Sequence, residues 1–187
     1  MSKHMKTIVA AVLLLLLGGW IGYHIEKKKI VIPKLVPSSL PGTSASSSAV
    51  SVARGAKLVL LGGCNDCHTT KLPNGQPDMK LMLSGYRART PQPPAIPGVI
   101  TANPELTAWR GPWGLSLSMN ITPDKKTGIG RWTLAQFIHT MRTGVDPSGH
   151  ALMPPMPYQT LGRLSHDDLA AMYNYLMSIR PIHNRVL

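Results

Sequence analysis

Residues 62–68 read GGCNDCH, and this stretch decides the fold because it holds both cysteines of the chain. Cys64 and Cys67 stand at positions i and i+3, so in a helical turn their thiols share one face. His68 follows directly, and its imidazole can reach a metal held on that face. The spacing C-x-x-C-H is the attachment signature of c-type haem, in which two thioethers hold the porphyrin and the histidine binds the iron. The motif therefore predicts one covalently attached haem c, with His68 as the proximal iron ligand.

The two cysteines have three other possible uses. A dithiol redox pair would require alternating strands and helices of the thioredoxin type, which the sequence does not indicate. A zinc site would need two more ligands from scattered His or Asp residues, and a lone disulfide would leave His68 without a role. Haem attachment uses all three residues of the motif, so we favour it.

A long apolar segment lies upstream, where residues 7–25 read TIVAAVLLLLLGGWIGYHI. As a helix it would be about 28 Å long, close to the thickness of a bilayer's hydrocarbon core. A cleaved signal peptide is the alternative, because Lys3 and Lys6 provide a basic start. Trp20 and Tyr23 lie where an interfacial aromatic belt would anchor a retained helix. We therefore expect a transmembrane helix at 7–25.

These features predict the domain plan of the chain. Residues 1–6 form a cytoplasmic end, 7–25 the anchor, 26–50 a flexible linker rich in Pro and Ser, and 51–187 the haem-binding domain. Because haem c is attached outside the cytoplasm, we expect the domain on the periplasmic side of a bacterial inner membrane, crossed once by the chain.

Composition narrows the function classes. The chain carries 20 Lys+Arg against 8 Asp+Glu, a formal charge of +12, yet only 15% of its residues are charged. Two cysteines exclude both a multi-disulfide scaffold and a four-cysteine zinc site within one chain. The basic surface suits acidic faces of redox proteins or anionic lipid, whereas nucleic acid is not expected outside the cytoplasm. Aromatic residues make up only 5%, so another group is expected to fill part of the core.

Three amphipathic helices are expected around the motif. One leads into Gly62, a second opens at a capping box of Thr133 and Gln136 and stops at Gly144, and a third opens at Ser165. In the first helix, Val52, Ala56, Val59 and Leu60 fall at helical spacing. The apolar stripes of the other two helices, which we assign to the core, comprise Leu134, Phe137, Ile138 and Met141, and Leu169, Met172, Tyr173 and Leu176.

Three segments together resemble single-haem cytochrome c domains, especially the modules that accompany bacterial periplasmic dehydrogenases. They are GGCNDCHT at 62–69, NITPDKKTGIGRW at 120–132 and PPMPYQTLGRLSHDDLAAMYNYL at 154–176, and the resemblance runs from about Val52 to Ile182. It implies an all-α cytochrome c fold around one haem, with the carboxy-terminal helix packed across the helix before the motif. With the anchor, the expected fold class is an all-α domain plus an N-terminal transmembrane helix.

The distal iron ligand is expected to be Met156, which prolines flank on both sides. In the resembling modules the ligand occupies the same place, before a proline and an aromatic residue. A methionine sulfur favours ferrous iron and fills the sixth position. Met153 is the main alternative, and His139 and His150 are further ones.

The sequence also suggests neighbours for the haem. Asn120, Arg131 and Trp132 are candidates to donate hydrogen bonds to its propionates, although turn and packing roles are equally open for Asn120 and Trp132. The carbonyl of Leu72 or Pro73 is expected to hold the free nitrogen of the His68 ring.

Between the motif and Asn120 lies a long Pro-rich stretch that we interpret as a surface loop along the haem edge. Its arginines, Arg87, Arg89 and Arg110, suggest a role in docking partners.

These features predict a membrane-anchored monohaem cytochrome c that cycles between Fe(III) and Fe(II), an electron carrier and not an enzyme. Its expected partners are a dehydrogenase, an oxidase or another respiratory complex. A haem-based gas sensor or peroxidase-like enzyme with a labile distal ligand is the alternative. A structural subunit with an incidental haem is a third possibility.

Overall fold

The computed structural model of the chain describes residues 47–186. The anchor expected at 7–25 lies outside them, as do the predicted cytoplasmic end and most of the predicted linker. In the described part, no helix has both the length and the apolar character needed to cross a membrane. The expected N-terminal transmembrane helix is therefore not part of the fold that the structure shows.

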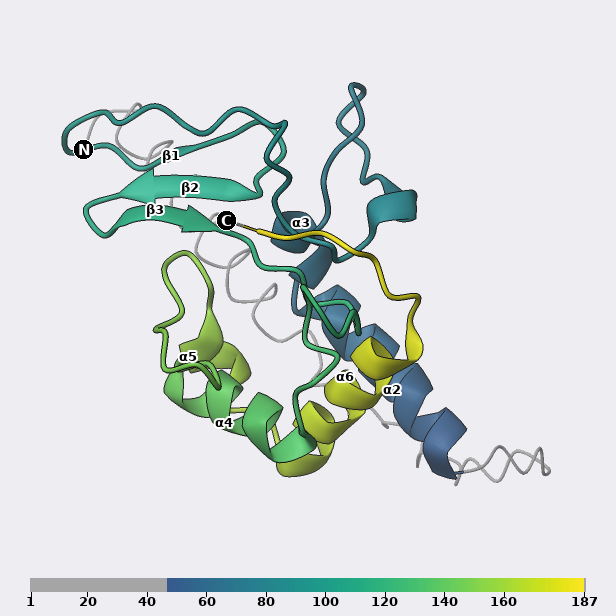
Figure 1. Cartoon of the computed structure of the whole chain (residues 1–187). Helices are drawn as coiled ribbons and strands as arrows, with labels where there is room; N and C mark the ends of the chain where they lie inside the picture. The colour runs from purple at the N-terminus through teal and green to yellow at the C-terminus, as the bar shows by residue number, and fades with distance from the viewer. Residues whose placement is uncertain (1–46, 187) are drawn as a thin grey trace, which may run out of the picture. The chain divides into compact units, whose positions relative to one another are not determined.

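Helix α2 (Ser47–Leu61) packs across helix α6 (His166–Ser178), the most extensive contact between two elements of the described chain (Figure 1). Gly55 is buried at the crossing, and a Cβ atom there would overlap the carbonyl oxygen of Ala171. The absence of a side chain thus lets the two backbones approach closely. The expected packing of the carboxy-terminal helix on the helix before the motif is confirmed.

The side chains of α2 divide between core and solvent. Val59 is 1% exposed and lies in the core, whereas Leu60 is 69% exposed. Gly55 and Val59 mark the core face, and Leu60 lies one position beyond it, about 100° further around the helix. At one side of the crossing, Arg54 and Asp168 form an ion pair at 2.6 Å.

Helix α4 (Leu134–Thr143) begins and ends at the predicted residues. Thr133 and Gln136 form the capping box, and Gly144 ends the helix in the left-handed conformation. The short helix α5 (Tyr158–Leu161) follows a loop, and α6 begins after Ser165, whose side chain accepts a hydrogen bond from the Asp168 N–H. The buried core is formed chiefly by Val59, Leu83, Ile129, Phe137, Ile138, Met141, Leu161, Leu169, Met172 and Leu176.

The all-α expectation is wrong, because the Pro-rich stretch folds into a three-stranded antiparallel sheet in the order β1-β2-β3. The strands are β1 (Thr101–Ala102), β2 (Ala108–Gly111) and β3 (Gly114–Leu117). Strands of two to four residues are too short to show alternating polarity in the sequence. The turn between Gly111 and Gly114 was the available signal, since these residues pair across a two-residue connection.

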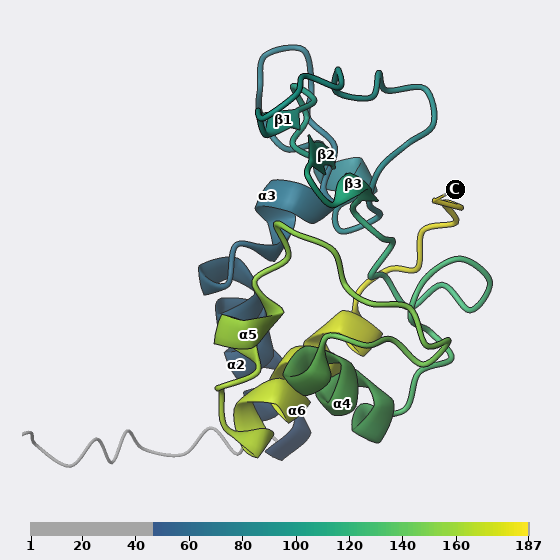
Figure 2. The same ribbon diagram turned by 90° about the vertical axis from the view of Figure 1, so that its left-hand side faces the viewer.

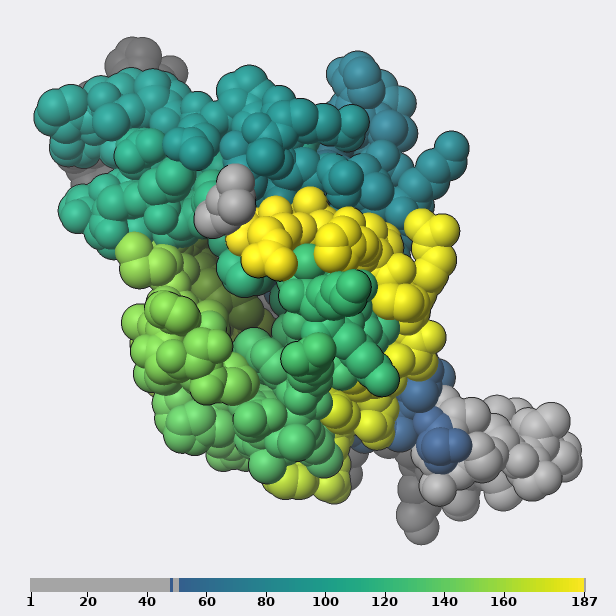
Figure 3. Space-filling model, in the orientation of Figure 1, coloured from purple at the N-terminus to yellow at the C-terminus, as the bar shows by residue number. Residues whose placement is uncertain are grey.

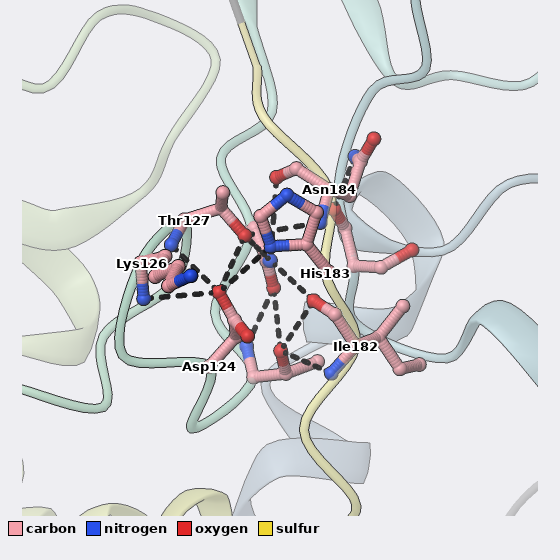
Figure 4. Close-up of polar contacts among 9 residues, drawn as sticks. Asp124, Lys126, Thr127, Ile182, His183 and Asn184 are labelled. Carbon is pink, nitrogen blue, oxygen red and sulfur yellow. Dashed lines mark hydrogen bonds and ion pairs between the residues drawn. The ribbon is translucent and has the colours of Figure 1, made fainter.

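The segment after α6 runs as an extended strap, residues 179–186, along the loop that follows the sheet (Figure 4). Asn120 lies beneath it, 1% exposed, and its amide donates to the carbonyl oxygen of Ile182 at 2.8 Å. The Asn184 N–H donates to the Thr127 hydroxyl at 3.0 Å. The strap therefore fixes the loop at 120–127 through its own backbone.

Candidate haem site

The cysteine motif forms a short helix, α3 (Cys64–His68), directly after α2. Gly63 precedes it with φ 67°, a left-handed conformation that allows the sharp turn between the two helices. Cys64 and Cys67 are half-buried and not joined to each other. Burial raises the pKa of the Cys64 thiol to about 11 and raises that of Cys67 too, so both thiols carry protons at neutral pH. The pair is available for covalent attachment on one turn of helix.

The His68 imidazole is held by one backbone carbonyl. Its Nδ1 lies 2.7 Å from the carbonyl oxygen of Met119, which can only accept, so Nδ1 carries the proton and Nε2 has the lone pair. Burial lowers the pKa of His68, and the bond to Met119 partly opposes this. The ring is therefore neutral and oriented, as a metal ligand must be.

The prediction that the carbonyl of Leu72 or Pro73 holds the His68 ring is wrong. The carbonyl oxygen of Leu72 accepts instead from the Gly75 N–H at 2.8 Å, within a small loop after the motif. The acceptor, Met119, lies 51 residues from His68, just after the strand β3 that the sequence did not predict. A pairing across that distance has no local sequence signal.

Gly85 makes this arrangement possible. Its N–H donates to the His68 carbonyl oxygen at 2.8 Å, and its φ is 79°. A Cβ atom at Gly85 would overlap the carbonyl of Ser118 and the backbone of Met119. The segment at Gly85 therefore lies between the motif and the end of the sheet, in contact with both.

Lys71 is a site residue that the sequence reasoning missed. Its Nζ donates to the carbonyl oxygens of Asp66 at 2.8 Å and Thr69 at 3.0 Å, and reaches that of Asn65 at 3.4 Å. The Asp66 carbonyl lies in the last turn of α3 and Thr69 is its C-cap residue, so the ammonium sits at a helix end where a cation is favourable. Partial burial lowers the pKa of Lys71. The available signal was a lysine three residues after the motif.

Met156 lies in the loop between α4 and α5, which reaches up to the sheet (Figure 2). The side chain is half-buried and packs on the core that Cys64 also contacts. The loop is held by a bond from the Ser116 hydroxyl to the carbonyl oxygen of Pro154, 2.5 Å. A Cβ at Gly62 would lie 3.3 Å from the Leu161 side chain, so α5 approaches the start of the motif.

The alternative distal ligands are more open to solvent. Met153 is 37% exposed, His139 lies exposed on α4, and the His150 side chain is 82% exposed beside Asp146. Met156 remains the predicted ligand.

The three residues predicted near the propionates lie in one loop before α4, in different settings. The amide of Asn120 is already bonded to Thr127 and to the carboxy-terminal strap. Arg131 is exposed, and Trp132 is half-buried with its carbonyl accepting from the Tyr173 hydroxyl at 2.7 Å. Their contact with haem stays a prediction.

The donor set fits an iron porphyrin. Two thiols and a neutral, oriented imidazole share one short helix, and a thioether lies in a loop packed on the same core. The space-filling view shows a hollow between the loop before α5, drawn light green, and the loop around 120–130 (Figure 3). The residues present are those that covalent attachment and two axial ligands require.

No protein-family model matches the sequence. The chain is 33% identical over 149 residues, 80% of its length, to a nicotinate dehydrogenase subunit of Pseudomonas putida, and 33% identical over 141 residues, 75% of its length, to the fructose dehydrogenase cytochrome subunit of Gluconobacter japonicus. It is 24% identical over 176 residues, 94% of its length, to a diheme cytochrome c-type protein of Cereibacter sphaeroides.

The matches cover 10%, 24% and 49% of these relatives, so the chain corresponds to one part of larger proteins. Their names support a cytochrome c domain here, with electron transfer as its function, and do not favour a gas sensor or peroxidase.

Proposed function

We propose that this cytochrome c domain carries single electrons on one haem c. The arrangement of α3 carries the proposal, because two free thiols share a helix with a histidine that Met119 holds in the ligating tautomer. When bound, the haem supplies the change between Fe(III) and Fe(II). Cys64 and Cys67 would hold it covalently, and Nε2 of His68 and the Met156 sulfur would bind its iron, the sulfur favouring the ferrous state.

The cysteine count supports a single haem. Each haem c uses two cysteine side chains in this motif, and the chain has two. The relative from Cereibacter sphaeroides is named as a diheme protein, so it differs from this proposal in the number of haems.

A dehydrogenase is the proposed electron donor. Two of the relatives are named as subunits of nicotinate and fructose dehydrogenases. Residues 51–187 carry 14 Lys and Arg against 7 Asp and Glu, a net +7 that suits a partner with an acidic docking face. If such a face guides docking, the rate of reduction by the donor falls as ionic strength rises; a rate independent of salt contradicts electrostatic docking.

We place the domain on the periplasmic face of the inner membrane, held there by the apolar segment at 7–25. The test is extraction of membranes from cells expressing the full chain. A retained anchor keeps the haem protein in the pellet after alkaline washing and releases it with detergent. Recovery of the haem protein in the alkaline wash, in a form that has lost residues 7–25, contradicts a retained anchor.

The haem itself is tested by maturation of the full chain in a host with a cytochrome c assembly system. The expected product is red, retains haem after denaturing electrophoresis, and has the mass of the polypeptide plus one haem. Cys64→Ser with Cys67→Ser is expected to remove the covalent haem, whereas Ser148→Ala, an exposed loop control, is expected to keep it. A colourless wild-type protein with polypeptide mass alone contradicts the proposal.

A further inference from the structure

Two buried nitrogen donors in the described chain have no hydrogen-bond partner. They are Nη1 of Arg87 and Nε1 of Trp113. A buried donor left unpaired costs about 1–3 kcal/mol, and more where it is charged. Within the described residues, the Arg87 side chain also forms no ion pair with a carboxylate. Such groups indicate a missing acceptor, and for the guanidinium an anionic one.

Arg87 lies next to the proximal side of the candidate haem site. Two residues earlier, the Gly85 N–H donates to the carbonyl oxygen of His68. The neighbouring Tyr86 N–H donates to the Ser118 carbonyl at 2.8 Å. The backbone just before Arg87 is thus tied, through Gly85, to the residue that would bind the iron.

Trp113 lies in the turn between β2 and β3. Its indole ring folds back over the hairpin, since a Cβ at Gly111 would overlap it. On the following strand, the Ser116 hydroxyl bonds to the carbonyl of Pro154, in the loop that carries Met156. The hairpin therefore connects Trp113 to the loop of the predicted distal ligand.

We propose that Arg87 and Trp113 bind the haem propionates, an inference that rests on the proposed function. A haem between His68 and Met156 would have protein segments tied to Arg87 on one side and to Trp113 on the other. The propionates are the anionic groups of the haem and accept hydrogen bonds, which matches one cationic and one neutral N–H donor. Asn120 bonds to other parts of the chain and Arg131 is exposed, whereas Arg87 and Trp113 hold the buried nitrogen donors of the described residues that have no partner.

The test compares two variants of the holoprotein with matched controls. Arg87→Gln removes the charge and Trp113→Phe removes only the N–H. Arg89→Gln changes an exposed arginine nearby, and Trp109→Phe changes an indole whose N–H already donates to the Leu106 carbonyl at 2.9 Å. Redox titration and the resonance Raman propionate bands are measured for all four, together with Arg87→Lys.

Removing a cation beside a propionate leaves that anion to stabilise ferric iron. We expect the equilibrium constant for reduction to fall about tenfold in Arg87→Gln, equivalent to about 59 mV for a one-electron couple. Arg87→Lys retains part of the difference, and Trp113→Phe shifts the propionate bands with a smaller change in the constant. The controls stay close to wild type.

Shifts in Arg87→Gln and Trp113→Phe no larger than in their controls overturn the inference, with haem content and far-ultraviolet circular dichroism confirming that the variants fold. A role limited to packing, or hydrogen bonds to water, gives that result. If the wild type carries no covalent haem, the proposed function fails instead, so the two failures are distinguishable.

Discussion

His68 is fixed by contacts that come from two remote segments. The Met119 carbonyl accepts from its ring, and the Gly85 N–H donates to its own carbonyl. Ring and backbone are therefore held separately, which limits rotation of the imidazole about the bond to the iron. One helical turn is enough to bring the two cysteines onto one face, whereas the orientation of the His68 ring depends on Met119, which lies just after β3.

The distal ligand is a residue-scale prediction. In the matured protein, Met156→Ala removes the proposed sulfur ligand, so a weaker ligand or water binds the iron and the midpoint potential falls. Absorption spectra of the ferric protein are expected to lose the sulfur-to-iron charge-transfer band. Met153→Ala serves as the control and keeps it. The reverse pattern assigns the iron to Met153.

Lys71 is predicted to stabilise α3. Lys71→Met keeps the aliphatic stem but removes the ammonium from the carbonyls of Asp66 and Thr69. We expect the free energy of unfolding of the holoprotein to fall by about 1 kcal/mol, measured by urea denaturation. Lys57→Met, on the exposed face of α2, is expected to change it by less than about 0.5 kcal/mol. Equal effects of the two substitutions would refute a specific role for Lys71.

At the scale of elements, the crossing of α2 and α6 depends on Gly55. Gly55→Ala would normally favour a helix, yet here the added methyl meets the Ala171 carbonyl, so the helices must separate. We expect a loss of about 2–3 kcal/mol in unfolding free energy. Ala53→Ser, on the exposed face of the same helix, is the control. A stabilised Gly55→Ala protein would mean that the helices do not cross closely at this point.

Because of the ion pair between Arg54 and Asp168, the stability of the packing between α2 and α6 depends on pH. Hydrogen bonds from Ser165 and from Arg54 lower the pKa of Asp168. The resulting stabilisation is complete above the unfolded-state pKa of the carboxyl group and is lost as pH falls through its lower folded-state pKa. Arg54→Gln is expected to be less stable than wild type near neutral pH, and the two curves should converge in acid or high salt. A difference that persists at low pH contradicts this account.

Elements with strong local signals were predictable, and those without them were not. The capping box at Thr133 and the left-handed Gly144 gave α4 its bounds, since both act within one helical turn. The sheet was missed because its strands are short and their stabilisation comes from pairings such as Trp109 with Ser116. The cysteine motif could be recognised from its local spacing, whereas the contact between His68 and Met119 joins residues far apart in the chain and forms only on folding.

At the scale of the molecule, the carboxy-terminal strap joins segments that are distant in the sequence. The Asn184 amide donates to the carbonyl oxygens of Ser84 and Tyr86, both at 2.8 Å, and its backbone N–H donates to Thr127. Ser84 and Tyr86 flank Gly85, which contacts His68. The strap therefore supports the backbone behind the proximal ligand from the far end of the chain.

The last prediction about the strap concerns Asn184→Ala. This substitution removes the side-chain amide that donates to the carbonyl oxygens of Ser84 and Tyr86. We expect a loss of about 2 kcal/mol in unfolding free energy of the holoprotein. Hydrogen exchange at the Gly85 amide should also accelerate, because its N–H loses the support that keeps it on His68.

Arg185→Ala, an exposed neighbour on the strap, is the control and should leave both measurements near wild type. If Asn184→Ala lowers stability while Gly85 exchange is unchanged, the strap stabilises the fold without reaching the iron ligand. If both effects appear together, a residue three positions from the carboxy terminus helps to set the rigidity of the proximal histidine.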